Sequence, residues 1–471
     1  MNQNLQKVKY ILADIVSAAF AWFSFFVYRK SIVYPNILHE WDLIFDDTNL
    51  YLGIAVIPLF WIVLYVMIGA YRRVYRKSRI KELGQTAMIT LIGGLILFFA
   101  LMLDDDVVSY KDYYFSLLFF ISIHFSLTFL FRLIITTSTV YKIQSRKIGF
   151  NTILVGSNGN AKKIYKQIEN EKLSSGTRFI GFIHVTERKH FPMDKYLKHL
   201  GSKDDLRRLV IDNKVEEVII AIERSEHEII EEIITQLFDL SIVIKIIPVL
   251  EDFLLGTVKT QSVWHTPLIQ LSPELMPVWQ MSMKRLLDIV ASSIAILLLS
   301  PVYIGVAIAV KLDSKGPVLY SQERVGIGGK AFLMHKFRTM IQDAEKEGPQ
   351  LSSDHDPRIT KVGRFMRKVR LDEIPQFFTV LKGDMTLVGP RPERQYFIDL
   401  IVKKAPQYRL LQRIKPGITS WGQVKYGYAS NVDEMIERLK YDILYLENMS
   451  LAMDFKIMIW TVLIIVQGRG K

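Results

Sequence analysis

Long apolar runs dominate the first third of the chain. Four of them cover residues 10–28, 51–71, 83–103 and 113–131, and each approaches the ~20 residues that a helix needs to cross a bilayer. Asp14 is the only acidic residue within these runs, and its place near one end predicts an interfacial position. The pattern predicts a bundle of four transmembrane helices over residues 1–147.

The charges between these runs predict how the bundle is oriented. The loop at 72–81 has six basic residues and no acid. The loop after the third run has the acids Asp104, Asp105, Asp106 and Asp112 against Lys111 alone. Basic residues again follow the fourth run: Arg132, Lys142, Arg146 and Lys147. Because cytoplasmic loops carry an excess of Lys and Arg, both ends of the bundle are expected in the cytoplasm.

From residue 151 onward, short β-rich segments alternate with helical ones. The β-rich segments include NTILVG (151–156), FIGFIHV (179–185), VEEVIIAI (215–222) and SIVIKIIPV (241–249). This order predicts a parallel, Rossmann-like α/β domain over 148–255, followed by a linker over 256–280. The turn GSNGNA (156–161) lacks the full G-x-G-x-x-G spacing, and the second strand ends without a ribose-binding acid. A structural or regulatory module is therefore a better interpretation than a working NAD site.

A fifth apolar run, at 289–310, differs from the first four. Ser300 and Pro301 lie in its middle, where proline removes a backbone hydrogen bond and predicts a bend. Basic residues flank it on both sides: Lys284, Arg285, Lys311 and Lys315. A proline-kinked transmembrane helix is one interpretation. A re-entrant helix over about 284–312, which enters and leaves on one side, keeps both flanks in the cytoplasm.

Composition restricts the classes of function. The 471 residues include no cysteine, which excludes disulfides, thiolate metal sites and thiol nucleophiles. The formal net charge of +13 suits contact with anionic lipids or phosphorylated substrates. Nucleic acid is not an expected partner, because the basic residues bracket apolar segments.

The C-terminal part of the chain contains a series of dense motifs. In order, they are KFRTM (336–340), DPRITKVGRFMRKVRLDEIPQ (356–376), KGDMTLVGPRP (382–392), RIKPGITSWGQV (413–424) and YDILYLENMSLAMDFKI (441–457). With the bent helix, they resemble the bacterial sugar transferase family, the polyprenyl-phosphate phosphoglycosyl transferases that have one re-entrant membrane helix. The resemblance covers 281–471, and a mostly helical catalytic domain is expected there. The four spans and the CoA-binding-like middle domain resemble the large exopolysaccharide-initiating members.

The resemblance implies the reaction and the residues that perform it. A sugar-1-phosphate would pass from a UDP-sugar to undecaprenyl phosphate, giving UMP and the diphosphate-linked lipid that starts exopolysaccharide, capsule or O-antigen synthesis. Asp372 matches the family nucleophile, which would form an acyl-phosphate that the lipid phosphate then attacks. Glu373 matches its partner and would help to bind Mg²⁺. Taken alone, this acidic pair would be expected on a solvated surface.

Basic residues surround the acidic pair in the sequence: Lys336, Arg338, Arg358, Arg364, Arg367, Arg370 and Arg391. Arginine's planar fork suits phosphate oxygens. The resemblance favours Lys336, Arg367 and Arg391 as phosphate ligands, and Arg338 is included with them. Arg370 departs from the family pattern, which often has a small polar residue there. Asp442 and Asp454 match later acidic positions, where a site role and a packing role both remain open.

Two other classes of function remain open. One is a membrane-tethered nucleotide-sugar oxidoreductase or epimerase acting through the α/β domain, but the chain lacks a suitably placed Tyr-x-x-x-Lys pair. The other is a non-catalytic scaffold for polysaccharide assembly, which would not need the acidic pair. For the transferase, we expect a homodimer in the bacterial inner membrane, in contact with membrane lipids, with the middle and catalytic domains in the cytoplasm. The sequence does not identify the sugar.

Overall fold

The computed structural model forms two compact units, which are described separately. It describes residues 3–33, 41–102, 110–187, 190–222, 227–237, 240, 242–247, 266, 268–271, 275–342, 344, 356–427 and 429–467. The first unit comprises residues 1–151, 163–179 and 262–266, and the second comprises the rest of the chain. Asp104–Asp106 and most of the expected linker 256–280 lie outside the described residues.

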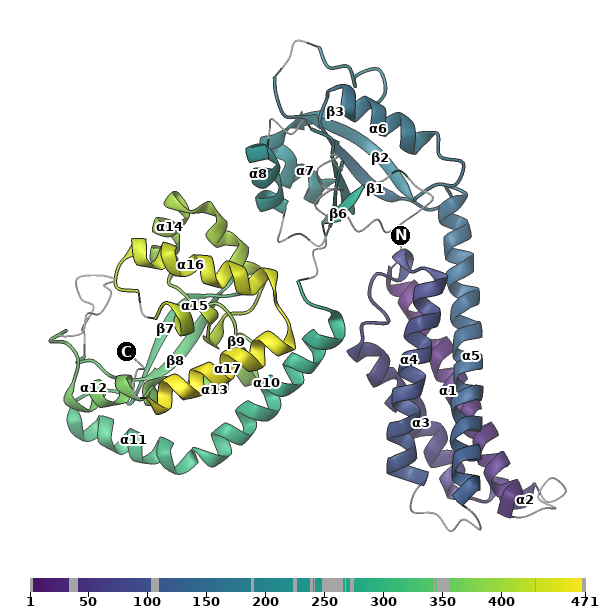
Figure 1. The fold of residues 1–471 in the computed structure, drawn as a ribbon, viewed down its shortest axis with the longest axis horizontal. Helices are drawn as coiled ribbons and strands as arrows, with labels where there is room; N and C mark the ends of the chain where they lie inside the picture. The colour runs from purple at the N-terminus through teal and green to yellow at the C-terminus, as the bar shows by residue number, and fades with distance from the viewer. Residues whose placement is uncertain are drawn as a thin grey trace. The chain divides into compact units, whose positions relative to one another are not determined.

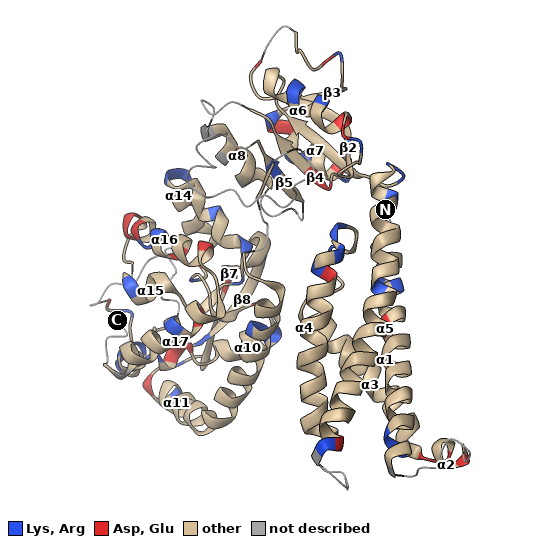
Figure 2. Cartoon of the chain, turned by 45° about the vertical axis from the view of Figure 1, so that its right-hand side comes forward, with Lys and Arg blue, Asp and Glu red and all other residues tan. Residues whose placement is uncertain are grey.

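The N-terminal part of the first unit is helical (Figure 1). Its elements are α1 (Gln3–Val33), α2 (Asp42–Phe45), α3 (Thr48–Met67), η2 (Val74–Arg76), α4 (Arg79–Leu97), the π-helical turn η3 (Phe98–Met102) and α5 (Tyr110–Gln144). Within the described chain, four of these helices have the length and composition to cross a membrane, in agreement with the four apolar runs. Figure 2 shows that most of their length carries no charged residue. Helix α1 packs against α3 and α5, and α4 packs against α5.

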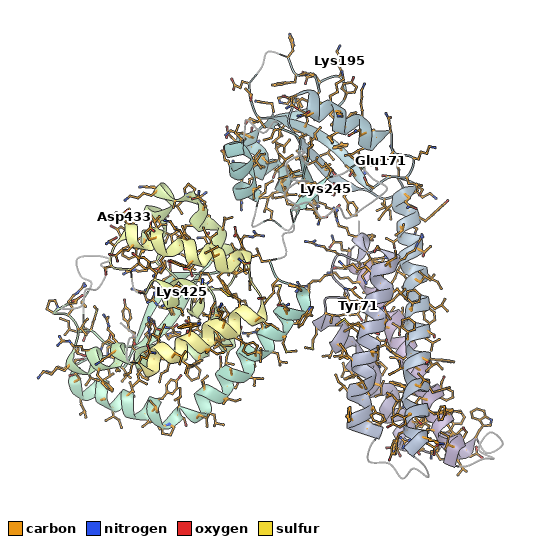
Figure 3. The ribbon with its side chains drawn as sticks, viewed as in Figure 1. Tyr71, Glu171, Lys195, Lys245, Lys425 and Asp433 are labelled. Carbon is orange, nitrogen blue, oxygen red and sulfur yellow. The ribbon has the colours of Figure 1, made fainter. Side chains whose placement is uncertain are left out.

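A buried ion network lies among these helices, and Asp14 is part of it. The Asp14 carboxylate is 1% exposed and accepts two hydrogen bonds from Arg132, at 2.8 Å and 2.7 Å. It also accepts one from Tyr71, labelled in Figure 3, at 2.7 Å. Arg132 reaches Glu82 at 3.2 Å, and Glu82 pairs with Lys77 at 2.8 Å. Arg132 is therefore a fully buried helix residue, not the loop charge that its position after the apolar run indicated.

The middle of the chain forms the predicted α/β domain. Its elements are β1 (Phe150–Val155), α6 (Gly159–Glu169), β2 (Thr177–His184), β3 (His199–Ser202), η4 (Lys203–Asp205), α7 (Leu206–Asp212), β4 (Glu217–Ile220), α8 (His227–Leu237), β5 (Val243–Ile246) and β6 (Ile269–Leu271). The sheet order is β3-β2-β1-β4-β5-β6. Strands β1, β4 and β5 pair in parallel, and β6 pairs antiparallel at the edge. The central strands β1 and β4 are buried, as is typical of parallel sheets that helices cover, and buried aliphatic residues such as Ile153 and Val218 form the core.

Part of the α/β domain makes its contacts with the N-terminal helices. Residues 163–179, the end of α6 and the beginning of β2, group with the helices. The reason lies at the end of α5, where Arg146 pairs with Glu169 at 2.9 Å and the carbonyl of Gln144 accepts from the amide of Ser174. The long helix α5 thus ends in direct hydrogen-bonded contact with part of the α/β domain.

The C-terminal domain begins with two helices and continues as a compact mixture of short elements. They are α10 (Val278–Leu298), α11 (Ser300–Asp313), β7 (Leu319–Val325), η6 (Ile327–Gly329), β8 (Ala331–Phe337), α12 (Lys361–Lys368), η7 (Leu371–Glu373), α13 (Gln376–Lys382), β9 (Thr386–Val388), α14 (Gln395–Lys404), η8 (Pro406–Arg413), β10 (Gly417–Thr419), α15 (Trp421–Lys425), α16 (Val432–Glu447) and α17 (Leu451–Val466). Strands β7 and β8 form an antiparallel hairpin, and β9 pairs in parallel with β10.

Helices α10 and α11 are two arms of one bent apolar helix (Figure 1). The break lies at Leu299, next to Ser300 and Pro301, and the arms differ in direction by 61°. Both arms pack on the same domain. In the middle of α10, Asp288 accepts a hydrogen bond from the Thr386 hydroxyl at 2.7 Å. At the end of α11, Asp313 accepts one from the amide of Val362 at 3.0 Å.

Candidate active site

A short 3-10 turn between α12 and α13 carries Asp372 and Glu373. The turn begins at Arg370, whose φ of 59° lies in the left-handed region that non-glycine residues rarely adopt. Pro375 then provides the N-cap of α13, where its fixed φ suits a helix start. Both carboxylates are buried, at 9% and 7% exposure. The acidic pair is therefore not on a solvated surface.

Three cations converge on Glu373. Lys336, from strand β8, lies 2.7 Å from Glu373 Oε1, and Arg370 lies 3.3 Å from Oε2. Arg391, from the loop after β9, lies 3.6 Å from Oε1. Burial by itself raises the pKa of Glu373, but these three charges outweigh it and hold the pKa well below its usual range. Glu373 is thus a permanent anion that gathers cations at one point.

Asp372 is adjacent to Glu373, but its carboxylate has different surroundings. Among the described residues its carboxylate makes no hydrogen bond or ion pair. Burial and the neighbouring charge of Glu373 raise its pKa, against the opposing charges of Lys336 and Arg367. A buried carboxylate that faces cations without being bound by them is poorly solvated. Such a group is suited to attack an electrophile.

The other two predicted phosphate ligands lie apart from this point. Arg367, on α12, donates to the Thr339 hydroxyl at 3.0 Å, and its charge acts on Asp372. Arg338 is 6% exposed and donates to the carbonyls of Lys315 and Ser314 at 2.6 Å and 2.8 Å. Its guanidinium fixes the backbone that follows α11. The structure therefore brings Lys336 and Arg391 to the acidic pair directly, places Arg367 within electrostatic reach, and gives Arg338 a backbone contact.

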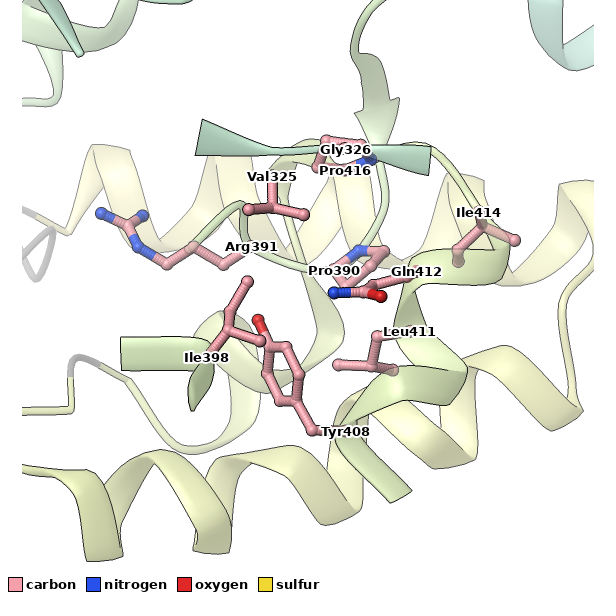
Figure 4. Close-up of a pocket in the computed structure, with 10 residues that line it drawn as sticks. All are labelled: Val325, Gly326, Pro390, Arg391, Ile398, Tyr408, Leu411, Gln412, Ile414 and Pro416. Atoms are coloured by element: carbon pink, nitrogen blue, oxygen red, sulfur yellow. The ribbon is translucent and has the colours of Figure 1, made fainter. Parts of the chain in front are cut away.

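A small cavity lies beside Arg391 (Figure 4). Its lining includes Tyr408, Leu411 and Gln412, and its volume of about 20 Å³ has room for roughly one water molecule. In Figure 4 the guanidinium of Arg391 extends away from Gln412 and Leu411. The cavity is thus part of the packing behind the Arg391 loop and is too small to hold a nucleotide sugar.

Sequence reasoning missed how the bent helix contacts the acidic turn. The Tyr303 hydroxyl, on α11, donates to the carbonyl of Ile374 at 2.5 Å. Val306 and Ile374 belong to one buried apolar cluster with Phe337. An uncharged tyrosine inside an apolar run gave no signal of this contact. The bend places α11 directly behind the residue that follows Glu373.

Asp442 and Asp454, the two later acids, have packing contacts in the structure. Asp442 accepts a hydrogen bond from the amide of Gly422 at 3.0 Å. Asp454 pairs with Lys284 at 2.6 Å and accepts from the Tyr445 hydroxyl at 2.6 Å. Since Lys284 lies on α10, Asp454 joins the last helix to the first arm of the bent helix.

The acidic pair can also be considered as a metal site. Among the described residues, no group of three or more His, Asp and Glu side chains is gathered around one point. Mg²⁺ is commonly held by one or two carboxylates together with substrate phosphates and water, so it needs no larger protein cage. Asp372 and Glu373 supply two adjacent carboxylates, and Asp372 makes no competing hydrogen bond among described residues. The residues present therefore fit a magnesium ion shared with a phosphorylated substrate.

Comparison with known proteins agrees with this geometry. The family model described as "Bacterial sugar transferase" matches residues 279–468, which include both arms of the bent helix and the acidic turn. A protein of Caulobacter vibrioides, named as a UDP-glucose:undecaprenyl-phosphate glucose-1-phosphate transferase, is 39% identical over 183 residues. These cover 38% of this chain and 68% of that protein.

The chain belongs to the bacterial sugar transferase family.

Two further family members extend the comparison. An Aeromonas hydrophila UDP-N-acetylgalactosamine-undecaprenyl-phosphate N-acetylgalactosaminephosphotransferase is 42% identical over 221 residues, 47% of this chain and 52% of that protein. A Klebsiella pneumoniae UDP-glucose:undecaprenyl-phosphate glucose-1-phosphate transferase is 29% identical over 423 residues, 88% of this chain and 90% of that protein. The chain spans only about half the length of several relatives that it matches, including the Aeromonas protein.

A second family model, described as "CoA-binding domain", matches residues 67–248. It covers the α/β domain as far as β5 and also α4 and α5, so the match begins well before the first strand. This fits the direct contact between the end of α5 and the α/β domain. The family has a membrane association, which the long apolar helices of this chain support.

Proposed function

We propose that this family member transfers a sugar-1-phosphate from a UDP-sugar to undecaprenyl phosphate and releases UMP. The observation that carries the proposal is the contrast within the acidic pair. Glu373 is bound by three cations, whereas its neighbour Asp372 is buried and makes no hydrogen bond or ion pair among the described residues. A transferase that forms a covalent intermediate needs both a cation cluster for phosphate charge and an unbound nucleophile.

The proposed reaction has two displacement steps at one phosphorus atom. In the first, an Asp372 oxygen attacks the phosphorus that bears the sugar. The bond from this phosphorus to the bridging oxygen of UMP breaks, and UMP leaves. In the second, an oxygen of undecaprenyl phosphate attacks the same phosphorus, the bond to Asp372 breaks, and its carboxylate is restored. The product is the diphosphate-linked lipid that would start a surface polysaccharide.

The basic residues have distinct roles in this scheme. Lys336 and Arg391 lie at the acidic pair and would neutralise the non-bridging phosphate oxygens of the nucleotide sugar. Arg367 supplies further positive potential at Asp372. Glu373 would hold Mg²⁺, which would supply charge neutralisation for the diphosphate. Arg338 acts on the backbone after α11, so we assign it a structural role.

We further propose that the bent helix is re-entrant and that the site faces the cytoplasm. A straight span would place the two ends of the helix on opposite sides of the membrane. Here Asp288, which directly precedes the uncharged run 289–310, and Asp313, at the end of α11, both bind the same domain. With both basic flanks on one side, the positive-inside rule favours the cytoplasm of a bacterial inner membrane. The acidic pair would then meet soluble UDP-sugars and a lipid phosphate at the bilayer surface.

The sugar and the assembly of subunits are open parts of the proposal. The relatives named above act on UDP-glucose and on UDP-N-acetylgalactosamine, so both belong in the first substrate panel. These relatives are transferases, which gives no support to the oxidoreductase and scaffold hypotheses. The homodimer remains an expectation, which light scattering of the purified protein would test.

One experiment tests the reaction and its nucleophile together. Purified protein is incubated with undecaprenyl phosphate, Mg²⁺ and each UDP-sugar, and UMP release is measured. We expect release with at least one sugar, and a loss of at least 10³-fold for Asp372→Asn, since the amide cannot form the acyl-phosphate. Mass spectrometry of the protein without lipid acceptor should show one sugar-phosphate on Asp372. Full turnover by Asp372→Asn would exclude the covalent route.

A further inference from the structure

The loop that presents Arg391 is held at both of its ends. On the β10 side, the amide of Gly389 donates to the carbonyl of Thr419 at 3.0 Å, and the amide of Gly417 donates to Pro390 at 2.9 Å. On the β7 side, the amide of Val325 donates to the carbonyl of Glu393 at 3.1 Å. Prolines before and after Arg391 fix the backbone further. The position of the Arg391 backbone is thus strongly determined.

A buried charged cluster lies beneath this loop. Glu393 is 4% exposed and receives a hydrogen bond from Arg438, on α16, at 2.7 Å. Arg324, on β7, lies 3.4 Å from the other carboxylate oxygen of Glu393 and donates to the carbonyl of Pro392 at 3.0 Å. Burial by itself raises the pKa of Glu393, but Arg438, Arg324 and Arg391 outweigh it and lower the pKa. Glu393 is therefore a buried anion that joins three segments of the domain.

The charge balance of this cluster shows why the acid matters. Arg324 and Arg438 are both largely buried, at 14% and 5% side-chain exposure, and Glu393 is the carboxylate that both contact. Without its charge, two buried guanidinium groups would repel each other directly behind Arg391. Removing one partner of a buried charge pair is strongly destabilising, so the segments would separate or admit water. The loop that carries Arg391 is the segment bound to all of these groups.

We propose that Glu393 is a positioning residue for Arg391. Its carboxylate bonds to Arg324 and Arg438, and it acts by holding the 389–393 loop so that Arg391 reaches Glu373. The consequence for catalysis rests on the proposed function, whereas the consequence for the loop does not. The two can therefore be tested separately.

The catalytic arm of the test is a double-mutant cycle on UMP release by the full-length protein. Glu393→Gln should lower kcat/KM by about 10- to 100-fold, the range typical of residues that orient a site ligand. In an Arg391→Ala background, Glu393→Gln should add less than a threefold loss, because its target is already absent. Losses that multiply would overturn the proposal. Arg438→Met should reproduce the effect of Glu393→Gln, and Arg438→Lys, which keeps the charge, should lose less.

The structural arm uses the absence of cysteine from the chain. Arg391→Cys introduces a single thiol, and its rate of alkylation by a maleimide reports how exposed the loop is. Adding Glu393→Gln should raise this rate at least fivefold. Lys404→Ala is the matched control, because it breaks an exposed ion pair of 2.6 Å between the neighbouring elements α14 and α16. It should leave the rate unchanged.

The outcomes distinguish the two proposals. If the wild type releases no UMP from any UDP-sugar, the transferase proposal fails, and the alkylation rates still decide whether Glu393 holds the loop. If the wild type is active but Glu393→Gln leaves the alkylation rate unchanged, the positioning role is wrong. Circular dichroism of each variant shows whether it is folded. If Glu393→Gln does not fold, the Arg438→Lys and Arg438→Met pair carries the same comparison.

Discussion

Removing Arg132 should destabilise the N-terminal helices more than any comparable surface change. Arg132 supplies both short hydrogen bonds to the buried Asp14 carboxylate. In Arg132→Met, Asp14 would keep only the Tyr71 hydroxyl, whereas Glu82 would still be paired with Lys77. One buried carboxylate is thus left without a cation. Breaking a buried pair in this way costs about 3–5 kcal/mol of unfolding free energy.

The assay is unfolding of the purified protein in mixed detergent micelles with increasing SDS, followed by tryptophan fluorescence. Trp61 is a suitable reporter, since it is fully buried among the same helices. The control is Lys30→Met, which breaks a partly exposed pair with Asp47 at 2.6 Å. Partly exposed pairs contribute about 0–1 kcal/mol, so the control should lose little.

A double variant tests whether the uncompensated charge is the cause. Arg132→Met with Asp14→Asn removes both charges and leaves an amide beside Tyr71. It should recover at least about 1.5 kcal/mol of the loss caused by Arg132→Met alone, which lies near the middle of the range of coupling energies for paired residues. A loss below 1 kcal/mol for the single variant would refute the reasoning. So would a double variant whose loss equals the sum of the two single losses.

Three further predictions concern the catalytic domain. Lys336→Met should lower kcat for UMP release by about 10²-fold, because it removes a preorganised cation that stabilises developing charge. The control is Lys382→Met, which replaces an exposed lysine and should leave kcat unchanged. Arg370→Gly should relieve the left-handed backbone strain and so raise the melting temperature. It also removes one cation from Glu373, so the kcat for UMP release should fall. The melting temperature should fall as the pH drops below about 4.5. The pKa of Glu393 is lower in the folded state than in the unfolded state, so its stabilising charge is lost as the pH falls through the folded-state pKa. Glu393→Gln should weaken this dependence of the melting temperature on pH.

The sequence predicted the elements better than the contacts between them. Apolar runs and β-rich alternation located four long helices and a parallel sheet, because periodicity records which face of an element is buried. It does not record which polar residues meet. Asp14 and Arg132 are 118 positions apart, and nothing in the sequence links them. Their pairing depends on how α1 packs against α5.

The same limit applied to the candidate site. The motif at 370–376 identified the acidic pair, and Lys336 and Arg391 were singled out because the family resemblance favoured them. Arg338 was included on charge alone, yet its guanidinium binds two backbone carbonyls. Residue type is a poor guide here, since arginine serves backbone and phosphate oxygens equally well. The contact of Tyr303 with Ile374 crosses from the bent helix to the acidic turn and had no sequence signal.

Because Asp372 and Glu373 lie on the 3-10 turn at 371–373, their positions are sensitive to insertions and deletions in the turn. A 3-10 helix has three residues per turn, so inserting or deleting one residue between Arg370 and Glu373 would rotate the following side chain by about 120°. A deletion before Asp372 would bring the glutamate to the position of the unbound acid, and an insertion would bring the aspartate to the position that the cations contact. The double substitution Asp372→Glu with Glu373→Asp keeps the charge and the composition of the pair. It changes the distance of each carboxylate from the backbone by one methylene group. A change of length within this short stretch would therefore disrupt the proposed site more than the same change in an exposed loop.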